Sequence, residues 1–474
     1  MNNKTVALLL LLICSRVIGQ TSNDAFVVTP YLQIGTNPTA QSLVLLWQAN
    51  NATANWSVEL QTNGQWVTTA APTATSIAVA NAPAHVVYRA ALTGLVSGST
   101  FKYRVLKNGK EVFISQAQAP KAPNQAQRFV VFGDIGAGTK AAKEIANGVY
   151  NAKADIILVP GDIVYDNGTI ADYKTKFWPI YNAINRDSVG VPLMRSIPFV
   201  GAVGNHDADS RDLDKQPDAL AYYHYWDQPL NGPISKEGSA ITPLLKGSDA
   251  NKKAFYEGAS NRYPTMANFS FNYGNAHWTV LDADTYVDWT DTVLVNWVKQ
   301  DLANSKEMPW HFVLYHHPGF NSSLEHFEQQ QMRLLAPVFE QGKVDVVFNG
   351  HVHNYQRSYP MFFKPMRNGV LIVGGKDNKT VRGRVVVGKW TLDKTFDGKT
   401  NTHPKGVIYI VTGAGGQDLY DPEQENDSDS WQKFTNKFIS TRHTFTVADL
   451  KGNTLTIQQL DANGKPVDSF VITK

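Results

Sequence analysis

Five short segments, spread over more than half of the chain, place Asp, Asn, Tyr or His beside glycine or at the end of an apolar run. They lie at 133–136, 161–165, 204–207, 313–316 and 350–353. Each segment is a weak signal by itself. Together, in this order, they supply oxygen and imidazole-nitrogen ligands for two adjacent metal ions, which can attack a phosphate ester with metal-bound hydroxide.

The oxygen ligands come first in the chain. Asp134 and Asp162 each follow a glycine at the end of a Val/Ile-rich run. Either Asp alone is more readily interpreted as a helix N-cap, but a carboxylate can also bridge two cations that lie ~3.5–4 Å apart. Tyr165 is ordinarily a packing residue. Beside Asp162, its phenolate is a hard anionic donor that favours a trivalent ion, with iron as the expected choice.

The remaining donors are an amide and imidazoles. Asn205 offers a carbonyl oxygen, although an Asx turn explains it equally well, and the adjacent His206 could be a ligand, a proton donor or an oxyanion stabiliser. His316 ends an apolar run. His351 and His353 are one residue apart, so on an extended segment both imidazoles point to the same side, as metal ligands do. Their joint occurrence across separate strand ends favours one shared metal site.

The chain that must position these residues consists of two regions with different sequence patterns. From about 25 to 117 the pattern is strand-like, with turn clusters between the strands, which predicts an antiparallel sandwich. The segment 92–105 resembles the hallmark segment of fibronectin type III-like domains. A linker is predicted at 120–127, where Pro, Ala and Gln accumulate.

After the linker, strands alternate with helices, which predicts an α/β domain with ligand groups at the carboxyl ends of its strands. The predicted helices are 139–151, 170–185 (broken or kinked near Pro179) and 291–303, and the predicted strands are 128–132, 155–159, 199–203, 268–273, 277–281, 310–315, 344–349 and 406–412. The stretch 207–266 is long, loop-rich and aromatic. The tail from 444 to 472 has the pattern of a β-meander.

The N-terminal segment predicts where the protein is delivered in or outside the cell. Lys4 precedes the apolar run 6–14, and cleavage after Gly19 completes the layout of a secretory signal peptide (1–19), so the protein is expected to be secreted or periplasmic. A buried helix or a membrane anchor is the alternative. The only cysteine, Cys14, lies in this run; lipid anchoring through it is disfavoured because Ile13 is larger than lipobox sequences usually allow.

Composition excludes little else. A chain of 474 residues is expected to form two or more domains. Its formal net charge of +3, without Lys or Arg runs, gives no nucleic-acid-binding signature. No later stretch is long and apolar enough to be transmembrane, and the oligomeric state stays open.

The five segments resemble the signature of the metallophosphoesterase superfamily, and Tyr165 resembles the additional tyrosine of the purple acid phosphatases within it. The resemblance covers about 128–357, and the preceding sandwich, including 30–33, resembles the N-terminal domain of the larger plant-type enzymes. It implies an all-β fibronectin type III-like sandwich (24–119), followed by an α/β (α+β) calcineurin-like metallophosphoesterase domain (128–474) whose β-sheet sandwich is flanked by helices.

The resemblance also implies a ligand set. Asp134, Asp162, Tyr165 and His353 would bind Fe(III), Asp162 would bridge, and Asn205, His316 and His351 would complete a site for zinc, iron or manganese. His206 and His326 would be substrate-side histidines, since His326 follows His316 by ten residues, as a leaving-group histidine does in the family.

The sequence departs from the family at three positions: Asp207 replaces a frequent Glu, Glu325 a frequent His, and His317 a frequent Ser or Ala. These affect the expected substrate preference and pH optimum, but not the metal site. The function expected is a secreted acid phosphatase that hydrolyses phosphate monoesters. The alternatives are a phosphodiesterase or nucleotide-cleaving enzyme, and a surface binding protein with a vestigial catalytic domain.

Overall fold

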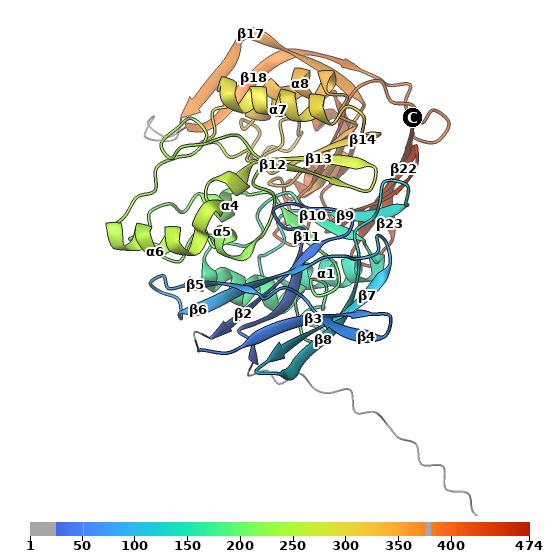
Figure 1. The fold of residues 1–474 in the computed structure, drawn as a ribbon. Coiled ribbons are helices and arrows are strands. Elements are labelled where there is room, and N and C mark those ends of the chain that lie inside the picture. The colour runs from blue at the N-terminus through green and yellow to red at the C-terminus, as the bar shows by residue number, and fades with distance from the viewer. Residues whose placement is uncertain (1–24, 51, 375–380) are drawn as a thin grey trace, which may run out of the picture.

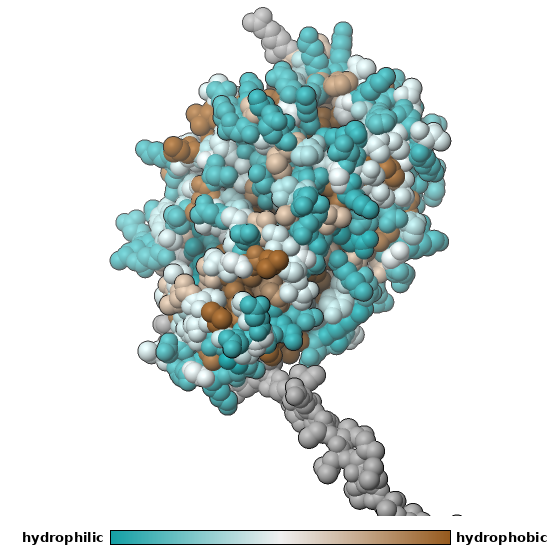
Figure 2. Space-filling view, turned by 45° about the vertical axis from the view of Figure 1, so that its right-hand side comes forward, coloured by the Kyte–Doolittle hydropathy of each residue, from teal (hydrophilic) through white to brown (hydrophobic). Residues whose placement is uncertain are grey.

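The computed structural model describes residues 25–50, 52–374 and 381–474. The predicted signal peptide, its cleavage site after Gly19 and Cys14 lie outside these residues. Among the described helices, none is long and apolar enough to cross a membrane. Hydrophilic side chains cover most of the face seen in Figure 2, with apolar ones scattered between them.

The N-terminal part forms two antiparallel four-stranded sheets (Figure 1). One contains β1 (Val28–Gln33), β2 (Leu43–Asn50), β6 (His85–Leu92) and β5 (Thr73–Ile77), in that order, and the other β4 (Gln65–Thr68), β3 (Trp56–Thr62), β7 (Thr100–Lys107) and β8 (Lys110–Gln118). Leu45 and Trp47 of one sheet share a core with Val58 and Val105 of the other. The predicted β-sandwich is therefore confirmed, whereas its fibronectin type III character and its boundaries stay predictions.

The rest of the chain is built on two larger sheets. The first has six strands in the order β11 (Phe199–Gly201), β10 (Ile156–Val159), β9 (Gln127–Val131), β21 (Thr444–Lys451), β22 (Thr454–Asp461) and β23 (Pro466–Thr473). Its β9, β10 and β11 are parallel. Its C-terminal strands form the predicted antiparallel meander, which joins the sheet through β9.

The second sheet has seven strands in the order β12 (Phe269–Tyr273), β13 (Ala276–Leu281), β14 (Trp310–Tyr315), β15 (Val346–Asn349), β19 (Ile408–Thr412), β16 (Tyr355–Ser358) and β20 (Thr435–Ile439). Its β13, β14, β15 and β19 are parallel. A long hairpin, β17 (Met361–Gly374) and β18 (Val381–Leu392), was not predicted from the sequence.

Helices cover the outer faces of both sheets, which explains why the parallel strands are continuous apolar runs. Phe129 of β9 meets Trp278 and Phe312 between the sheets. The outer face of the first sheet contacts α1 (Lys140–Ala152). That of the second sheet contacts α7 (Thr292–Asn304) and α8 (Ala336–Gln341). The result is the predicted sheet sandwich flanked by helices.

The segment after β10 is helical over a shorter range than the predicted 170–185. It consists of α2 (Ile170–Asp172), the π-helical turn η2 (Tyr173–Phe177) and α3 (Trp178–Tyr181). The predicted irregularity near Pro179 is confirmed as the π turn, which ends directly before α3; Pro179 itself lies in the first turn of α3, where its missing N–H is tolerated.

The predicted loop 207–266 is irregular but not free of helices. The short elements in and around it are α4 (Asn205–Ala208), α5 (Tyr222–Tyr225), α6 (Asp249–Ala259) and the 3-10 turns η3 (Ser260–Arg262) and η4 (Thr265–Ala267), and later 3-10 turns are η5 (Gln331–Leu335), η6 (Pro422–Asn426) and η7 (Ser428–Ser430).

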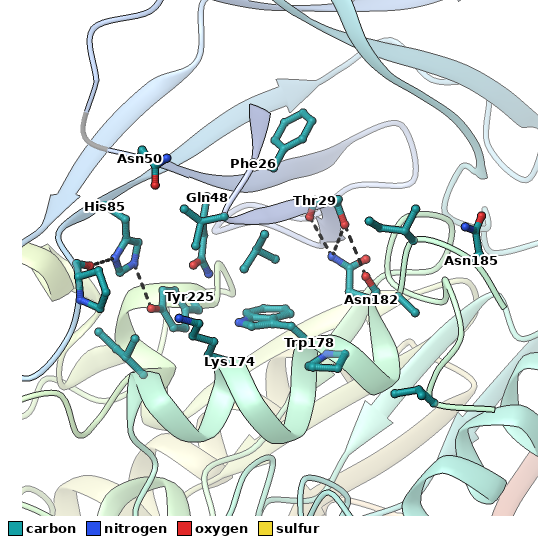
Figure 3. Close-up of a pocket in the computed structure, with 18 of the residues that line it drawn as sticks. Phe26, Thr29, Gln48, Asn50, His85, Lys174, Trp178, Asn182, Asn185 and Tyr225 are labelled. Carbon is teal, nitrogen blue, oxygen red and sulfur yellow. Dashed lines mark hydrogen bonds between the residues drawn. The ribbon is translucent and has the colours of Figure 1, made fainter. Parts of the chain in front are cut away.

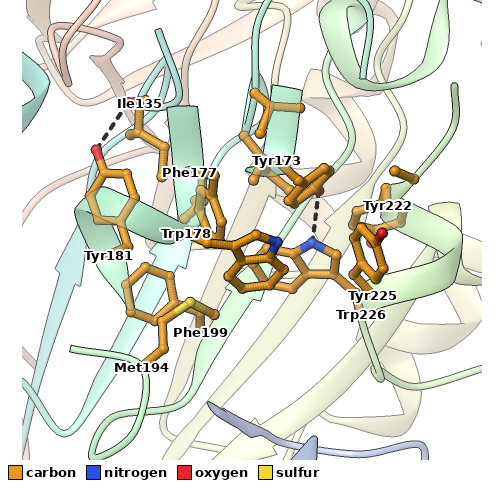
Figure 4. Packing of buried hydrophobic residues seen from close by; sticks show 14 of the residues in the cluster. Ile135, Tyr173, Phe177, Trp178, Tyr181, Met194, Phe199, Tyr222, Tyr225 and Trp226 are labelled. Carbon is orange, nitrogen blue, oxygen red and sulfur yellow. Dashed lines mark hydrogen bonds between the residues drawn. The ribbon is translucent and has the colours of Figure 1, made fainter. Parts of the chain in front are cut away.

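An aromatic cluster joins the N-terminal sandwich to the rest of the chain. Figure 4 shows its centre, where Trp178, Tyr225 and Trp226 lie together. Across the junction, the hydroxyl of Tyr31 donates to the backbone carbonyl of Tyr225 at 2.8 Å. Beside this contact lies a cleft of about 830 Å³ between β1 and α2–α3 (Figure 3), with His85 bonded to the Tyr225 hydroxyl at 3.0 Å. The shared core fixes the sandwich against the larger part of the fold.

Candidate metal centre

The candidate donors meet at one edge of the sheet sandwich. Parallel strands end at the same edge of a sheet, and the two sheets pack face to face, so residues that follow their carboxyl ends converge. The donors follow β9, β10, β11, β14 and β15, and comprise Asp134, Asp162, Tyr165, Asn205, His316, His351 and His353. Topology thus unites segments that are far apart in the sequence.

Glycine permits the close approach of these segments. A Cβ at Gly350 would lie 2.6 Å from the carbonyl oxygen of Pro160, 2.8 Å from Asp134 Oδ2 and 3.0 Å from His316 Nδ1. No other residue type fits there without displacing a candidate ligand. The Gly in the 350–353 segment is therefore a packing requirement of the site.

Three donors have a left-handed backbone conformation, with φ of +62° at Asp134, +50° at Asp162 and +67° at His351. Such a conformation costs roughly 1–3 kcal/mol per residue outside glycine and is concentrated at functional sites. At Asp134 it is held by the backbone N–H of His351, which donates to both carboxylate oxygens at 3.1 and 2.9 Å.

One half of the centre is built around Asp162. Its Oδ1 lies 3.2 Å from His316 Nε2 and accepts the backbone N–H of His206 at 3.0 Å. The Nε2 of His316 is also 3.2 Å from Asn205 Oδ1. Donor atoms of Asp162, His316 and His351 all lie within 4.8 Å of one another, and all three residues are buried. This spacing suits a single small cation.

The other half is built around Asp134. The hydroxyl of Tyr165 donates to Asp134 Oδ1 at 3.0 Å and lies 3.2 Å from His353 Nε2. Nε2 of His353 is 3.4 Å from the same carboxylate oxygen. Its Nδ1 contacts the backbone carbonyl of Asp418 at 2.7 Å, which directs Nε2 to the centre.

The two predicted substrate-side histidines lie beside these donors. The ring of His206 is 4.3 Å from that of Tyr165, and its Nδ1 is 2.7 Å from the carbonyl of Asp166, so its Nε2 is 3.9 Å from Asp162 Oδ2. The ring of His326 lies 4.0 Å from that of His351. Both are partly exposed, as Asn205 is, whereas the other donors are buried, so both can reach a bound molecule.

The carboxylates of the centre lack cationic partners other than histidine. Within the described residues, neither Asp134 nor Asp162 forms an ion pair with Lys or Arg. Burial raises the pKa of Asp162, but His316 outweighs it and holds this pKa well below its usual range. Burial lowers the pKa of His316, but Asp162 outweighs it and raises this pKa to about 10. A metal ion would supply the same compensation to these buried anions without a proton.

Tyr165 is a neutral phenol in this environment. Its burial, together with Asp134 and Asp162, raises its pKa well above the ordinary value. Only a strongly charged cation bound at the oxygen would favour the phenolate. The donor set of the second half therefore fits a trivalent ion better than a divalent one.

Asp207 is not one of the converging donors. Its carboxylate accepts backbone N–H groups of Ile163, Val164 and Gly204 at 3.0–3.3 Å. Burial, and then Asp162, raises its pKa to about 7. Asp207 thus links the 161–165 and 204–207 segments. Glu325, another of the three departures from the family pattern, is exposed.

Further residues reach the centre without any sequence signal. The ring of Tyr420 stacks on that of His353 at 4.0 Å, Gln329 Oε1 contacts His351 Nε2, and Asp284 Oδ1 lies 3.2 Å from His317 Nδ1. None of these three additional side chains belongs to a local motif. Only the tertiary fold brings them to the site.

Comparisons with known proteins agree with this geometry. Residues 127–355 match the family model described as calcineurin-like phosphoesterase. The probable inactive purple acid phosphatase 1 of Arabidopsis thaliana is 24% identical over 427 residues, which cover 82% of this chain and 58% of that protein. Purple acid phosphatase 22 of the same plant is 26% identical over 267 residues, covering 56% and 51%. The chain thus spans slightly more than half the length of these two relatives.

In fold, the chain is similar to the purple acid phosphatase PPD1 from yellow lupin (Lupinus luteus) seeds, with a TM-score of 0.63, 19% identity, and coverage of 94% of this chain and 74% of that one. The part of the chain that carries the site, residues 127–355, is therefore similar to the calcineurin-like phosphoesterases. The two plant proteins that it matches in sequence, and the lupin protein that it resembles in fold, are named purple acid phosphatases, the group that the five segments and Tyr165 predicted.

Proposed function

We propose that the chain is a two-metal acid phosphatase that hydrolyses phosphate monoesters. The observation that carries the proposal is the convergence of seven oxygen and nitrogen donors, from five strand ends, around buried carboxylates that no described Lys or Arg neutralises. The relatives named purple acid phosphatases support it.

The donors divide into two sets. Asp134, Tyr165 and His353 would hold Fe(III), Asp162 would bridge, and Asn205, His316 and His351 would hold a divalent ion, namely zinc, iron or manganese. When bound, such a pair polarises phosphate oxygens and lowers the pKa of water from 15.7 towards ~7.

His206 and His326 would act on the substrate. The Nδ1–H of His206 donates to the Asp166 carbonyl, so His206 in its cationic form would have a second N–H, at Nε2, to donate to a phosphate oxygen. Burial lowers the pKa of His326 to about 4. A bound phosphate anion raises the pKa of a neighbouring imidazole, so His326 would take up its proton with the substrate and pass it to the leaving alkoxide.

The compartment and the domain division belong to the same proposal. Cleavage after Gly19 would release the protein by secretion or into the periplasm. The sandwich (24–119) would be a separate domain from the catalytic one (128–474), with the linker at 120–127.

The test combines metal analysis with a panel of phosphate esters on the purified protein. We expect iron plus one divalent ion per chain, a visible tyrosinate-to-iron band, and faster hydrolysis of p-nitrophenyl phosphate than of its bis ester, with an acidic optimum. Preference for the bis ester would instead identify a phosphodiesterase, because the same ions serve both ester types. A protein with two ions but no esterase activity would favour the vestigial binding protein.

A further inference from the structure

His317, one of the departures from the family pattern, lies against a predicted metal ligand. Its buried ring is 4.0 Å from that of His351, with 38° between the planes. The ring of His326 also lies 4.0 Å from that of His351. The ring of His351 thus lies between two other imidazoles in addition to the proposed ligand His316, and of these two only His326 faces the proposed substrate.

Asp284 contacts the ring of His317. Its Oδ1 lies 3.2 Å from His317 Nδ1, and both side chains are almost fully buried, at 0 and 2% exposed. Within the described part of the chain, neither oxygen of Asp284 accepts a hydrogen bond. A buried carboxylate without donors is destabilising, so this placement beside an imidazole indicates a specific role.

The fold places Asp284 there with little freedom. Leu281 of β13 pairs with Tyr315 of β14, so the residues that follow these parallel strands share one edge. The backbone N–H of Asp284 donates to Asp282 Oδ1 at 3.0 Å, and the Tyr286 hydroxyl donates to Asp282 Oδ2 at 2.6 Å. The loop that carries Asp284 is thus fixed on both sides.

We propose that Asp284 and His317 are positioning residues that fix the ring of His351 and thereby set the affinity of the centre for its divalent ion. This inference rests on the proposed two-metal function. Partners outside the ligand shell orient metal-binding histidines, and their loss typically weakens metal binding by ~10–100-fold.

The chain contains a matched control pair. His277 Nε2 lies 3.0 Å from Asp301 Oδ2, with both side chains at most 10% exposed. This pair has other partners, since His277 Nδ1 contacts Asn272 and Asp301 also accepts from Thr279. None of its residues contacts a proposed ligand, so its disruption reports the general effect of losing a buried His–Asp contact.

The experiment titrates Zn²⁺ into full-length protein that retains iron but has been stripped of its divalent ion, and measures affinity by calorimetry. Asp284→Asn and His317→Phe should each weaken Zn²⁺ binding by ~10–100-fold, while Asp301→Asn should bind as the wild type does. Phe keeps a ring against His351 but loses the contact with Asp284. Asp284→Asn should therefore add nothing further in the His317→Phe background.

Two results would overturn the positioning role: wild-type Zn²⁺ affinity in both variants, or an equal loss in Asp301→Asn accompanied by lower stability of the metal-free protein. If the wild-type chain itself binds no divalent ion, the two-metal function fails and the inference fails with it. If the wild type binds iron and zinc but the variants match it, only the inference fails.

Discussion

Gly204 offers a sharp test of the proposed centre, because a single methyl group there meets a metal ligand. Its φ of −117° and ψ of 175° are extended, so alanine has no backbone penalty. A Cβ at this position would lie 2.3 Å from Asp162 Oδ1, 2.4 Å from the Asp162 backbone nitrogen and 3.0 Å from His316 Cδ2. The effect of Gly204→Ala is therefore steric and directed at Asp162.

The magnitude follows from these distances. An ordinary contact needs at least 3.4 Å, so Asp162 must move by about 1 Å. A misplacement of this size can lower the rate of a positioned reaction ~100-fold, which corresponds to ~2.7 kcal/mol of transition-state stabilisation. We expect kcat/KM on p-nitrophenyl phosphate to fall by this factor, with a lower content of both ions, since Asp162 is the proposed bridge.

Gly190→Ala is the control. Its Cβ would lie 2.0 Å from the Pro179 carbonyl oxygen and 2.8 Å from Ile180 Cα, so it is equally crowded but contacts no candidate ligand. It should lower thermal stability and leave kcat/KM per folded molecule unchanged. If Gly204→Ala keeps wild-type metal content and kcat/KM, or if Gly190→Ala loses both equally, then the proposal that Asp162 is the bridging ligand is wrong.

Three further predictions concern other groups. Tyr165→Phe should abolish the visible tyrosinate-to-iron band, and an unchanged band in the spectrum would remove Tyr165 from the ligand set. His326→Gln should slow the hydrolysis of alkyl phosphates ~100-fold or more but affect p-nitrophenyl phosphate much less, because a poor leaving group needs the proton that His326 donates; equal losses in kcat would contradict this role. Burial and then Arg262 lower the pKa of His224 to about 3, whereas the unfolded chain takes up this proton near pH 6.5, so stability is lost as the pH falls below 6.5. Between pH 7.5 and 5 the free energy of unfolding should fall by at most ~2 kcal/mol because of this group. Denaturant unfolding at several pH values should show a correspondingly smaller fall for His224→Gln than for the wild type. The same pH dependence in both proteins would disprove the assignment to His224.

The parts of the fold that could be predicted are those with strong local patterns. The parallel strands are buried on both faces, so they are short apolar runs that stand out between helices. The hairpin β17–β18 was missed because its apolar runs, such as 361–363 and 370–373, are separated by Lys364, Pro365 and Arg367, so no continuous pattern marks a strand of its length. The π turn before Pro179 could be predicted only as a break or kink near this proline, because the sequence shows the missing N–H of Pro179 but not the extra residue of the wider turn.

The residues of the site likewise divide into those with a local sequence signal and those without one. Candidate ligands such as Asp134 and His351 were predicted because each follows an apolar run beside a glycine, and this is the local sign of a sharp turn at a strand end. Tyr420 and Asp284 have no such sign. They approach His353 and His317 only because distant loops meet at the same edge, which is information that one sequence does not carry locally.

The features that make the site predictable are also those that would destabilise a protein without a ligand. Three donors have strained backbones, glycines are crowded against them, and the burial of Asp162 is offset by histidines and a backbone N–H, without a Lys or Arg among the described residues. A random surface loop has no reason to combine these costs, since each could be relieved by one substitution. Their concentration at a single edge is therefore the physical argument for a bound cation pair, and Tyr165, a buried phenol facing a carboxylate, is the argument that one of the two ions is trivalent.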